Sequence, residues 1–218
     1  RKLYLANQDR IAQQVQHREA SEFKKDKLKV LAELTKLRQI CCDPRLHYED
    51  YKAGSAKLDT CMELVHGAHD GGHRILLFSQ FTGMLDIIGK RLAKEDIAFL
   101  KLTGASSKES RAKMVAQFQA GEVPVFLISL KAGGVGLNLT AADVVIHYDP
   151  WWNVAAQDQA TDRAHRIGQQ HTVTVYKLIA KDTIEERIMQ MQESKRDLVN
   201  SVLGGDGISS ALFSREDV

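Results

Sequence analysis

Short apolar runs alternate with helix-like segments through the middle of the chain. The runs are rich in Val, Ile, Leu and Phe, and the segments between them repeat apolar residues at helical spacing. The runs are RILLFS (74–79), IAFLKLTG (97–104), VFLIS (125–129), ADVVIHYD (142–149) and TVTVYKLIA (172–180). Strands separated by helices in this way are typical of a parallel sheet with right-handed crossovers. We therefore predict an α/β fold, a three-layer domain with a mainly parallel sheet.

Helical patterns flank this predicted sheet on both sides. The segments with helical periodicity are 3–40, 57–69 and 182–203, and a turn-rich connection covers 41–55. The last of these helices is long, with Asp182 or Thr183 as its N-cap and Glu185 and Glu186 in its first turn. We expect the sheet to be preceded by a helical segment and followed by a long C-terminal helix.

The composition indicates a folded protein without a dominant charge. The 218 residues carry 30 Lys and Arg against 28 Asp and Glu, a formal net charge of +2, so any nucleic-acid surface is local. Three cysteines do not read as a disulfide framework and favour a reducing, intracellular setting. No apolar run approaches the roughly 20 residues that span a bilayer, so no membrane partner is expected. The chain begins at Arg1, as a piece of a longer protein would.

A glycine-rich segment, SLKAGGVGLN (129–138), follows the third apolar run. Ligands of an open parallel sheet bind beyond the carboxyl ends of its strands, and glycines let backbone N–H groups approach a phosphate closely. An ordinary glycine turn explains the segment equally well. It does not match GxGxxG, and the chain has no GxxxxGK[ST], so neither a Rossmann fingerprint nor a P-loop is present.

Two arginines lie three residues apart in QATDRAHRIGQ (159–169). If this stretch is helical, Arg163 and Arg166 share one face, where two guanidinium groups suit a phosphate. A solvated helix face paired with Asp158 and Asp162 is the ordinary alternative. With a glycine loop at a strand end nearby, an arginine finger that acts on a phosphate held by a neighbouring domain becomes a serious candidate.

These segments together resemble the motifs of the Swi/Snf-type DNA translocases, the chromatin-remodelling branch of the superfamily two helicase-like ATPases. LKAGGVGLNLTAADVVIHYDPWWN followed by QATDRAHRIGQ is similar to motifs V and VI, and RILLFSQFTGMLDII is similar to motif IV. The segments around them also resemble the family: LRQICCDPRL, GSAKLDTCMELV, LTGASSKESRAKMVAQF and VTVYKLIAKDTIEERI. The likeness runs from about residue 29 to 195, in the family's order.

The resemblance implies the C-terminal, second RecA-like lobe of a two-lobed ATPase. It divides the chain into a helical segment with its connection (1–56), a RecA-like helicase C-terminal lobe with motifs IV, V and VI (57–180), and a lobe-bracing helix with a C-terminal tail (181–218). The implied partners are the N-terminal RecA-like lobe of the same protein and the backbone of double-stranded DNA. The implied cofactors, ATP and Mg, are bound mainly by that first lobe.

The resemblance also assigns site residues. Arg163 and Arg166 are implied as catalytic residues that reach the γ-phosphate of ATP, while Gly136 lines the cleft and Gln159 positions the helix. The implied DNA contacts are Ser79, Gln80, Thr103, Gly104, Ala105 and Lys131. Hydroxyls, amides and loop N–H groups hold a phosphate backbone without reading its sequence. In this chain by itself we expect both arginines to point to solvent or to a stray anion.

Two other functions stay open. One is a non-catalytic docking module for nucleic acid or protein with the same fold, and the other is a strand-separating helicase. Intact Arg163, Arg166 and Gly136 favour the translocase. The chain departs from the family pattern at Val154, where Pro usually follows WWN, and at Thr103, where Asp is common. These departures affect loop shape rather than the assignment.

The lean lobe favours a prokaryotic member. The expected location is therefore the cytoplasm or nucleoid, or the nucleus if the source is eukaryotic, and a DNA-bound polymerase or chromatin protein is the candidate target. Trp151 and Trp152 are expected to pack mainly in the core and lobe interface. The basic run KKDKLK (24–29) reads as a charged helix face. No metal site is expected from the loosely metal-like spacing of Cys61, His66, His69 and His73.

Overall fold

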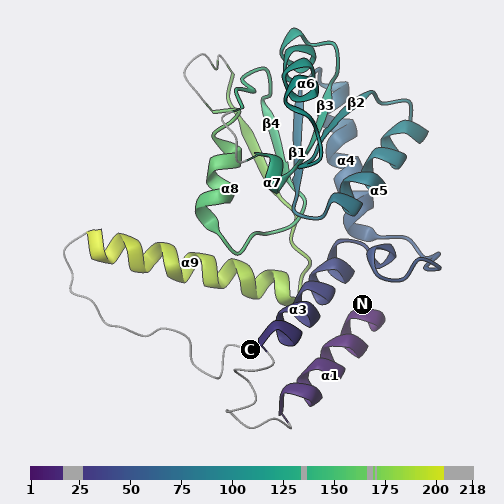
Figure 1. Cartoon of the computed structure of the whole chain (residues 1–218), viewed down its shortest axis with the longest axis vertical. Coiled ribbons are helices and arrows are strands. Elements are labelled where there is room, and N and C mark those ends of the chain that lie inside the picture. The colour runs from purple at the N-terminus through teal and green to yellow at the C-terminus, as the bar shows by residue number, and fades with distance from the viewer. Residues whose placement is uncertain (17–26, 134–136, 166–168, 170, 204–218) are drawn as a thin grey trace.

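The computed structural model describes residues 1–16, 27–133, 137–165, 169 and 171–203 (Figure 1). Within these residues five parallel strands form one sheet in the order β2-β3-β1-β4-β5. The strands are β1 (Ile75–Ser79), β2 (Phe99–Leu102), β3 (Val125–Ser129), β4 (Val144–His147) and β5 (Thr174–Lys177). The predicted α/β fold is confirmed, and the pairing is parallel throughout.

Helices cover both faces of the sheet. They are α4 (Ala56–Asp70), α5 (Thr82–Lys94), α6 (Lys108–Ala120), the short α7 (Leu130–Gly133) and α8 (Val154–Thr161). Side chains alternate along a strand, so Ile75 and Leu77 of β1 pack in one cluster with α4 and α5, whereas Leu76 and Phe78 pack in another with α6 and α8. Strands β1, β3 and β4 are buried on both faces, which explains their continuous apolar runs, whereas the edge strand β5 is exposed.

A third cluster joins the two ends of the chain. It contains residues of α1 (Lys2–Gln16), α3 (Lys27–Cys42) and α9 (Ile184–Leu203), and the 3-10 turn η1 (Pro44–Leu46) follows α3. Tyr4 of α1 reaches α9, because the backbone N–H of Ile184 donates a 2.8 Å hydrogen bond to its hydroxyl. Figure 1 shows α3 and α9 meeting below the sheet. The segments predicted as first and last therefore share one core.

The start of α9 resolves the predicted choice of cap. Asp182 has a positive φ of 58° and precedes the cap position. The hydroxyl of Thr183 accepts a 3.2 Å hydrogen bond from the backbone N–H of Glu185, and the Glu186 carboxylate accepts a 2.9 Å bond from that of Asp182. Thr183, the residue directly before the helix, is therefore the N-cap, and the Glu186 carboxylate satisfies the backbone N–H one residue earlier, at Asp182. Both predicted glutamates lie in the first turn.

A buried ion pair fastens α9 to the sheet layer. The Lys57 ammonium, in the first turn of α4, lies 2.7 and 2.6 Å from the two carboxylate oxygens of Glu185 in the first turn of α9. The side chains are only 9% and 1% exposed. Burial lowers the pKa of Lys57, but the surrounding acidic groups, Glu185 foremost, together outweigh it, so the net pKa lies above the ordinary value. Burial raises the pKa of the Glu185 carboxyl, and the adjacent Lys57 ammonium opposes that rise, so we treat the two contacting groups as an ion pair.

This pair predicts an asymmetric response to mutation. Glu185→Leu leaves a buried, unpaired ammonium, so the free energy of unfolding should fall by about 3 to 5 kcal/mol in a denaturant titration. Lys57→Met combined with Glu185→Leu should recover most of that loss. Glu33→Gln, which opens the exposed pair with Arg10, should cost less than about 1 kcal/mol. A double variant as unstable as Glu185→Leu would show that burial of the charge is not the cause.

Candidate nucleotide and nucleic-acid site

An open pocket of about 410 Å³ lies at the carboxyl ends of three adjacent strands, β1, β2 and β3. Its lining residues are Gln80, Thr82, Asp86, Lys101, Thr103, Gly104, Ala105 and Ser129. Four of the six residues predicted to contact DNA are among them. Parallel strands end at one edge of the sheet, which is why residues far apart in the chain meet here.

The turn after β2 gives this pocket hydrogen-bond donors. The Thr103 hydroxyl accepts a 3.3 Å bond from the backbone N–H of Ala105, which leaves the hydroxyl proton available for donation. The turn is held by Ser106, whose hydroxyl accepts a 3.2 Å bond from the backbone N–H of Thr103. Gly104 is exposed, and a Cβ at this position would meet nothing within 4 Å. The turn therefore presents small, open groups that can approach an anion closely.

Four lining residues were not among the predicted contacts: Thr82, Asp86, Lys101 and Ser129. Lys101 of β2 is exposed and forms an ion pair with Asp86 of α5. Ser129, at the end of β3, is 2% exposed, and its buried hydroxyl has no hydrogen-bond partner among the described residues. The signal for Lys101 is the single charge in the apolar strand FLKL. The sequence carries no such signal for Ser129, because its place in the pocket lining depends on the neighbouring strands.

Ser79 and Gln80 differ from each other in position. Ser79 is fully buried, and its hydroxyl donates a 2.6 Å hydrogen bond to Asp149, so it does not lie on the surface expected for a DNA contact. Gln80 is half-buried and lines the pocket, but its side-chain amide also donates to Asp149 and, at 3.3 Å, to the carbonyl of Pro150. The local sequence does not predict these bonds, because Ser79 and Gln80 lie at the end of β1 whereas Asp149 follows β4.

The glycine-rich segment is described only in part. Lys131 belongs to α7, and its side chain and Gly136 lie outside the described residues. Beyond the gap, Leu137 and Leu139 are buried in the cluster under α8. The backbone N–H of Leu139 donates a 3.0 Å hydrogen bond to the carbonyl of Arg163. This bond ties the end of the glycine segment to the arginine motif.

Arg163 is not on a helix face, which corrects the sequence prediction. Helix α8 ends at Thr161 with Asp162 as its C-cap, so Arg163 lies in the turn beyond it. Its residue is only 2% exposed, and it has interaction partners within the protein, so it does not point to solvent. The helical i and i+3 geometry fails because the helix stops too early. Gln159 is exposed on α8, and Arg166 lies outside the described residues.

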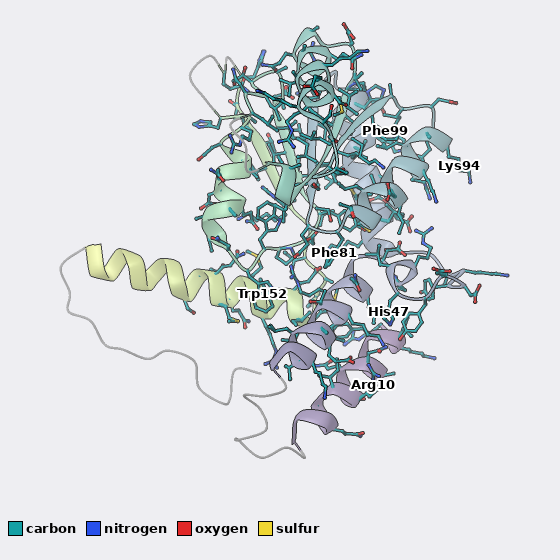
Figure 2. The ribbon with its side chains drawn as sticks, viewed as in Figure 1. Arg10, His47, Phe81, Lys94, Phe99 and Trp152 are labelled. Carbon is teal, nitrogen blue, oxygen red and sulfur yellow. The ribbon has the colours of Figure 1, made fainter. Side chains whose placement is uncertain are left out.

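The turn from β4 to α8 is anchored from two helices outside the sheet. The guanidinium of Arg38 on α3 donates a 2.7 Å bond to the carbonyl of Pro150, and the side-chain amide of Gln192 on α9 donates to that of Trp151. Trp151 is buried, as predicted, whereas Trp152 is 41% exposed and its ring lies 5.4 Å from the Arg38 guanidinium. Figure 2 shows Trp152 and Phe81 where the sheet meets α3 and α9.

A buried histidine supports α8 from below. His147 of β4 is stacked on Phe78, with ring centroids 5.5 Å apart, and its Nε2 lies 2.9 Å from the hydroxyl of Thr161. Thr161 itself donates to the carbonyl of Gln157, so we assign Nε2 as the protonated nitrogen of a neutral ring. Burial, and to a lesser degree the charge of Lys177, lowers the pKa of His147 to about 4.

The cysteine and histidines with metal-like spacing have separate environments. Cys61 is buried, His66 binds Glu95 at 2.8 Å, and His73 binds Asp143 at 2.7 Å. Across the described residues no group of three or more His, Cys, Asp or Glu side chains is arranged to hold a metal ion. None of the described helices is long and apolar enough to cross a membrane.

The sheet order, its flanking helices and the pocket define a RecA-like lobe. The family described as the helicase conserved C-terminal domain matches residues 56–168, and the chain belongs to this family. Two structures of the Sulfolobus solfataricus SWI2/SNF2 ATPase place it in the Swi/Snf-type branch. The chain is 33% identical to the C-terminal domain, with TM-score 0.75, covering 96% of this chain and 84% of that one. It is 35% identical to the core in complex with dsDNA, with TM-score 0.77, covering 94% and 43%.

Relatives among curated proteins are much longer than this chain. An uncharacterized ATP-dependent helicase of Mycoplasma pneumoniae is 42% identical over 207 residues, which is 94% of this chain and 20% of the relative. The chromatin-remodeling ATPase INO80 of Cryptococcus neoformans is 46% identical over 165 residues, which is 75% of this chain and 9% of the relative. The chain thus spans about a fifth of the length of the first relative and about a tenth of the length of the second.

The neutral state of His147 predicts a component of acid instability. Unfolded, the ring has a pKa near 6.5, so below that pH the unfolded chain binds a proton that the folded protein binds only near pH 4. Stability should therefore be full above pH 6.5 and should fall by about 3 kcal/mol from this residue as the pH drops toward 4. In urea titrations, His147→Phe should flatten the profile by that amount. An unchanged slope would show that His147 titrates normally.

Proposed function

We propose that the chain is the second lobe of an ATP-dependent translocase that moves along double-stranded DNA without separating its strands. The observation that carries the proposal is the pocket that brings Gln80, Thr103, Gly104 and Ala105 to one sheet edge beside Lys101. These groups have the chemistry of a phosphate-backbone contact, with hydroxyl and backbone donors and one cation. The likeness to a SWI2/SNF2 core in complex with dsDNA supports the same assignment.

The pocket binds the backbone through shape and charge rather than through bases. Thr103 and Gly104 supply donors from a small turn, and Lys101 supplies a positive charge once it leaves Asp86. The proposed contacts also include Lys131, at the start of the glycine segment. Ser79 acts indirectly, because its hydroxyl is buried against Asp149. Such contacts are indifferent to sequence, as movement along DNA requires.

The arginine motif acts on a nucleotide that another lobe holds. The chain has no P-loop, whereas Arg163 is buried, and its backbone carbonyl is held beside the glycine segment by the N–H of Leu139. These residues fit the role of adding charge to a triphosphate, not of gripping it unaided. Arg163 and Arg166 are the fingers, Gly136 and Gln159 lie at the cleft, and the first lobe holds ATP and Mg. The phosphate of bound ATP would attract these arginines and so stabilise the closed arrangement of the two lobes.

This function predicts that hydrolysis requires two lobes. The 218-residue chain should not hydrolyse ATP, whereas the complete protein with a P-loop lobe should, and duplex DNA should stimulate it. In the complete protein, Arg163→Lys and Arg166→Lys should each lower the stimulated rate at least a hundredfold, because a finger contributes about 10³ to 10⁵ in rate. The measurement is phosphate release with and without DNA.

The controls separate the competing functions. Thermal unfolding should be similar in wild type and variants, since Arg163→Lys keeps the buried charge. Full activity in both arginine variants would refute the fingers and favour the docking module. Equal stimulation by single-stranded and duplex DNA would refute movement on duplex DNA.

The pocket predicts a local electrostatic contribution to DNA binding. Lys101→Gln should weaken binding of duplex DNA by the complete protein uniformly across sequences, and the slope of log K against log salt should fall by about 1. Lys2→Gln, an exposed substitution on α1, is the matched control and should leave the slope unchanged. Equal slopes for wild type and Lys101→Gln would place the DNA elsewhere.

A further inference from the structure

The polar atoms at the end of β1 are turned inward by one buried carboxylate. Asp149 is 1% exposed, and one of its oxygens accepts from the Ser79 hydroxyl at 2.6 Å and from the backbone N–H of Gln80 at 3.3 Å. The other oxygen accepts from the side-chain amide of Gln80. An amide N–H can only donate, so Asp149 is the acceptor on both oxygens.

This arrangement fixes which end of the Gln80 amide faces the pocket. Its nitrogen contacts both Asp149 and, at 3.3 Å, the carbonyl of Pro150, which are acceptors for its two hydrogens. The reverse orientation would place the amide oxygen against a carboxylate. The oxygen Oε1 is therefore the atom left over, and no hydrogen bond to it comes from the described residues. A phosphate oxygen also only accepts, so Gln80 in this state offers a phosphate nothing.

We infer that Asp149 is a positioning residue that holds the donors of Ser79 and Gln80 away from the pocket, so that Gln80 donates to a phosphate only after it leaves Asp149. This inference rests on the proposed DNA contact and deepens it. Asp149 touches neither DNA nor nucleotide. Its role is to set whether the end of β1 presents an acceptor or a donor.

The turn that carries Asp149 connects this choice to the arginine motif. Arg38 and Gln192 hold the carbonyls of Pro150 and Trp151 from α3 and α9, and α8 begins directly after the turn. Arg163 follows the end of α8. A shift of α8 on engagement of Arg163 with a phosphate would therefore displace the turn whose Asp149 and Pro150 bind Gln80. Without such a shift, the contacts of Arg38 and Gln192 hold the turn, and with it the Asp149 carboxylate, in place.

Asp149→Asn tests the inference with little change of shape. One oxygen becomes an NH₂ group, which repels the Gln80 amide nitrogen and favours its oxygen, so the Gln80 NH₂ turns toward the pocket. The new donor should tighten nucleotide-free binding of duplex DNA by the complete protein about fivefold, the worth of one net hydrogen bond. A purely structural role would weaken binding or leave it unchanged.

Gln80→Met supplies the matched control, because Met has a similar length and no donor. The double variant, Asp149→Asn with Gln80→Met, should bind no more tightly than Gln80→Met alone. If Asp149→Asn tightens binding equally in both backgrounds, the loss of negative charge is the cause and the inference is overturned. Wild-type protein that fails to bind duplex DNA would instead refute the proposed function itself.

A measurement on the unaltered protein covers the case in which Asp149→Asn does not fold. In NMR spectra of glutamine-labelled protein, the Gln80 side-chain NH₂ should exchange slowly with water before DNA is added and should shift when DNA binds. A Gln80 NH₂ that exchanges as fast as those of exposed glutamines would overturn the inference.

Discussion

The ion pair between Lys57 and Glu185 determines how the helical layer lies against the sheet. It joins the first turns of α4 and α9 in a buried setting, where a lone charge is far more costly than a pair. Because the start of α9 is fixed there, Gln192, eight residues beyond Ile184 and about 12 Å along the axis, is placed within reach of Trp151. The turn after β4 thus takes its position from a contact made far from it in sequence.

The carboxyl edge of the sheet is organised by hydrogen-bond polarity as much as by charge. After β2, the Thr103 hydroxyl accepts a bond from the Ala105 N–H, which leaves its own proton available for donation. On β1, the donors of Ser79 and Gln80 face Asp149. Burial raises the pKa of Asp149 above its ordinary value, and the bonds from Ser79 and Gln80, followed by the charges of Lys57 and Arg38, offset part of that rise. The same bonds therefore serve stability and withhold donors from the pocket.

The sequence predicts best what depends on local pattern. The strands, their parallel pairing and the capped start of α9 follow from apolar runs, helix spacing and the residues near Thr183. The pocket was partly predictable, because strand ends converge on one edge in any parallel sheet. The inward orientation of the Ser79 hydroxyl was not predictable, since its acceptor, Asp149, lies 70 residues away in the sequence. The burial of Arg163 was not predictable either, because the end of α8 depends on the hydrogen bond between His147 and Thr161, which come from different elements.

The early end of α8 changes how the arginine motif can work. On an exposed helix face, Arg163 could bind an anion from solvent, and this binding would not change the structure of the lobe. Buried beyond the C-cap, with its carbonyl holding Leu139, it cannot reach a phosphate without moving its surroundings. Those surroundings lead through α8 to the turn at Asp149 and so to Gln80. In the proposed translocase, an enclosed Arg163 would link nucleotide contact to a change at the DNA edge, because packed interiors transmit displacement instead of absorbing it.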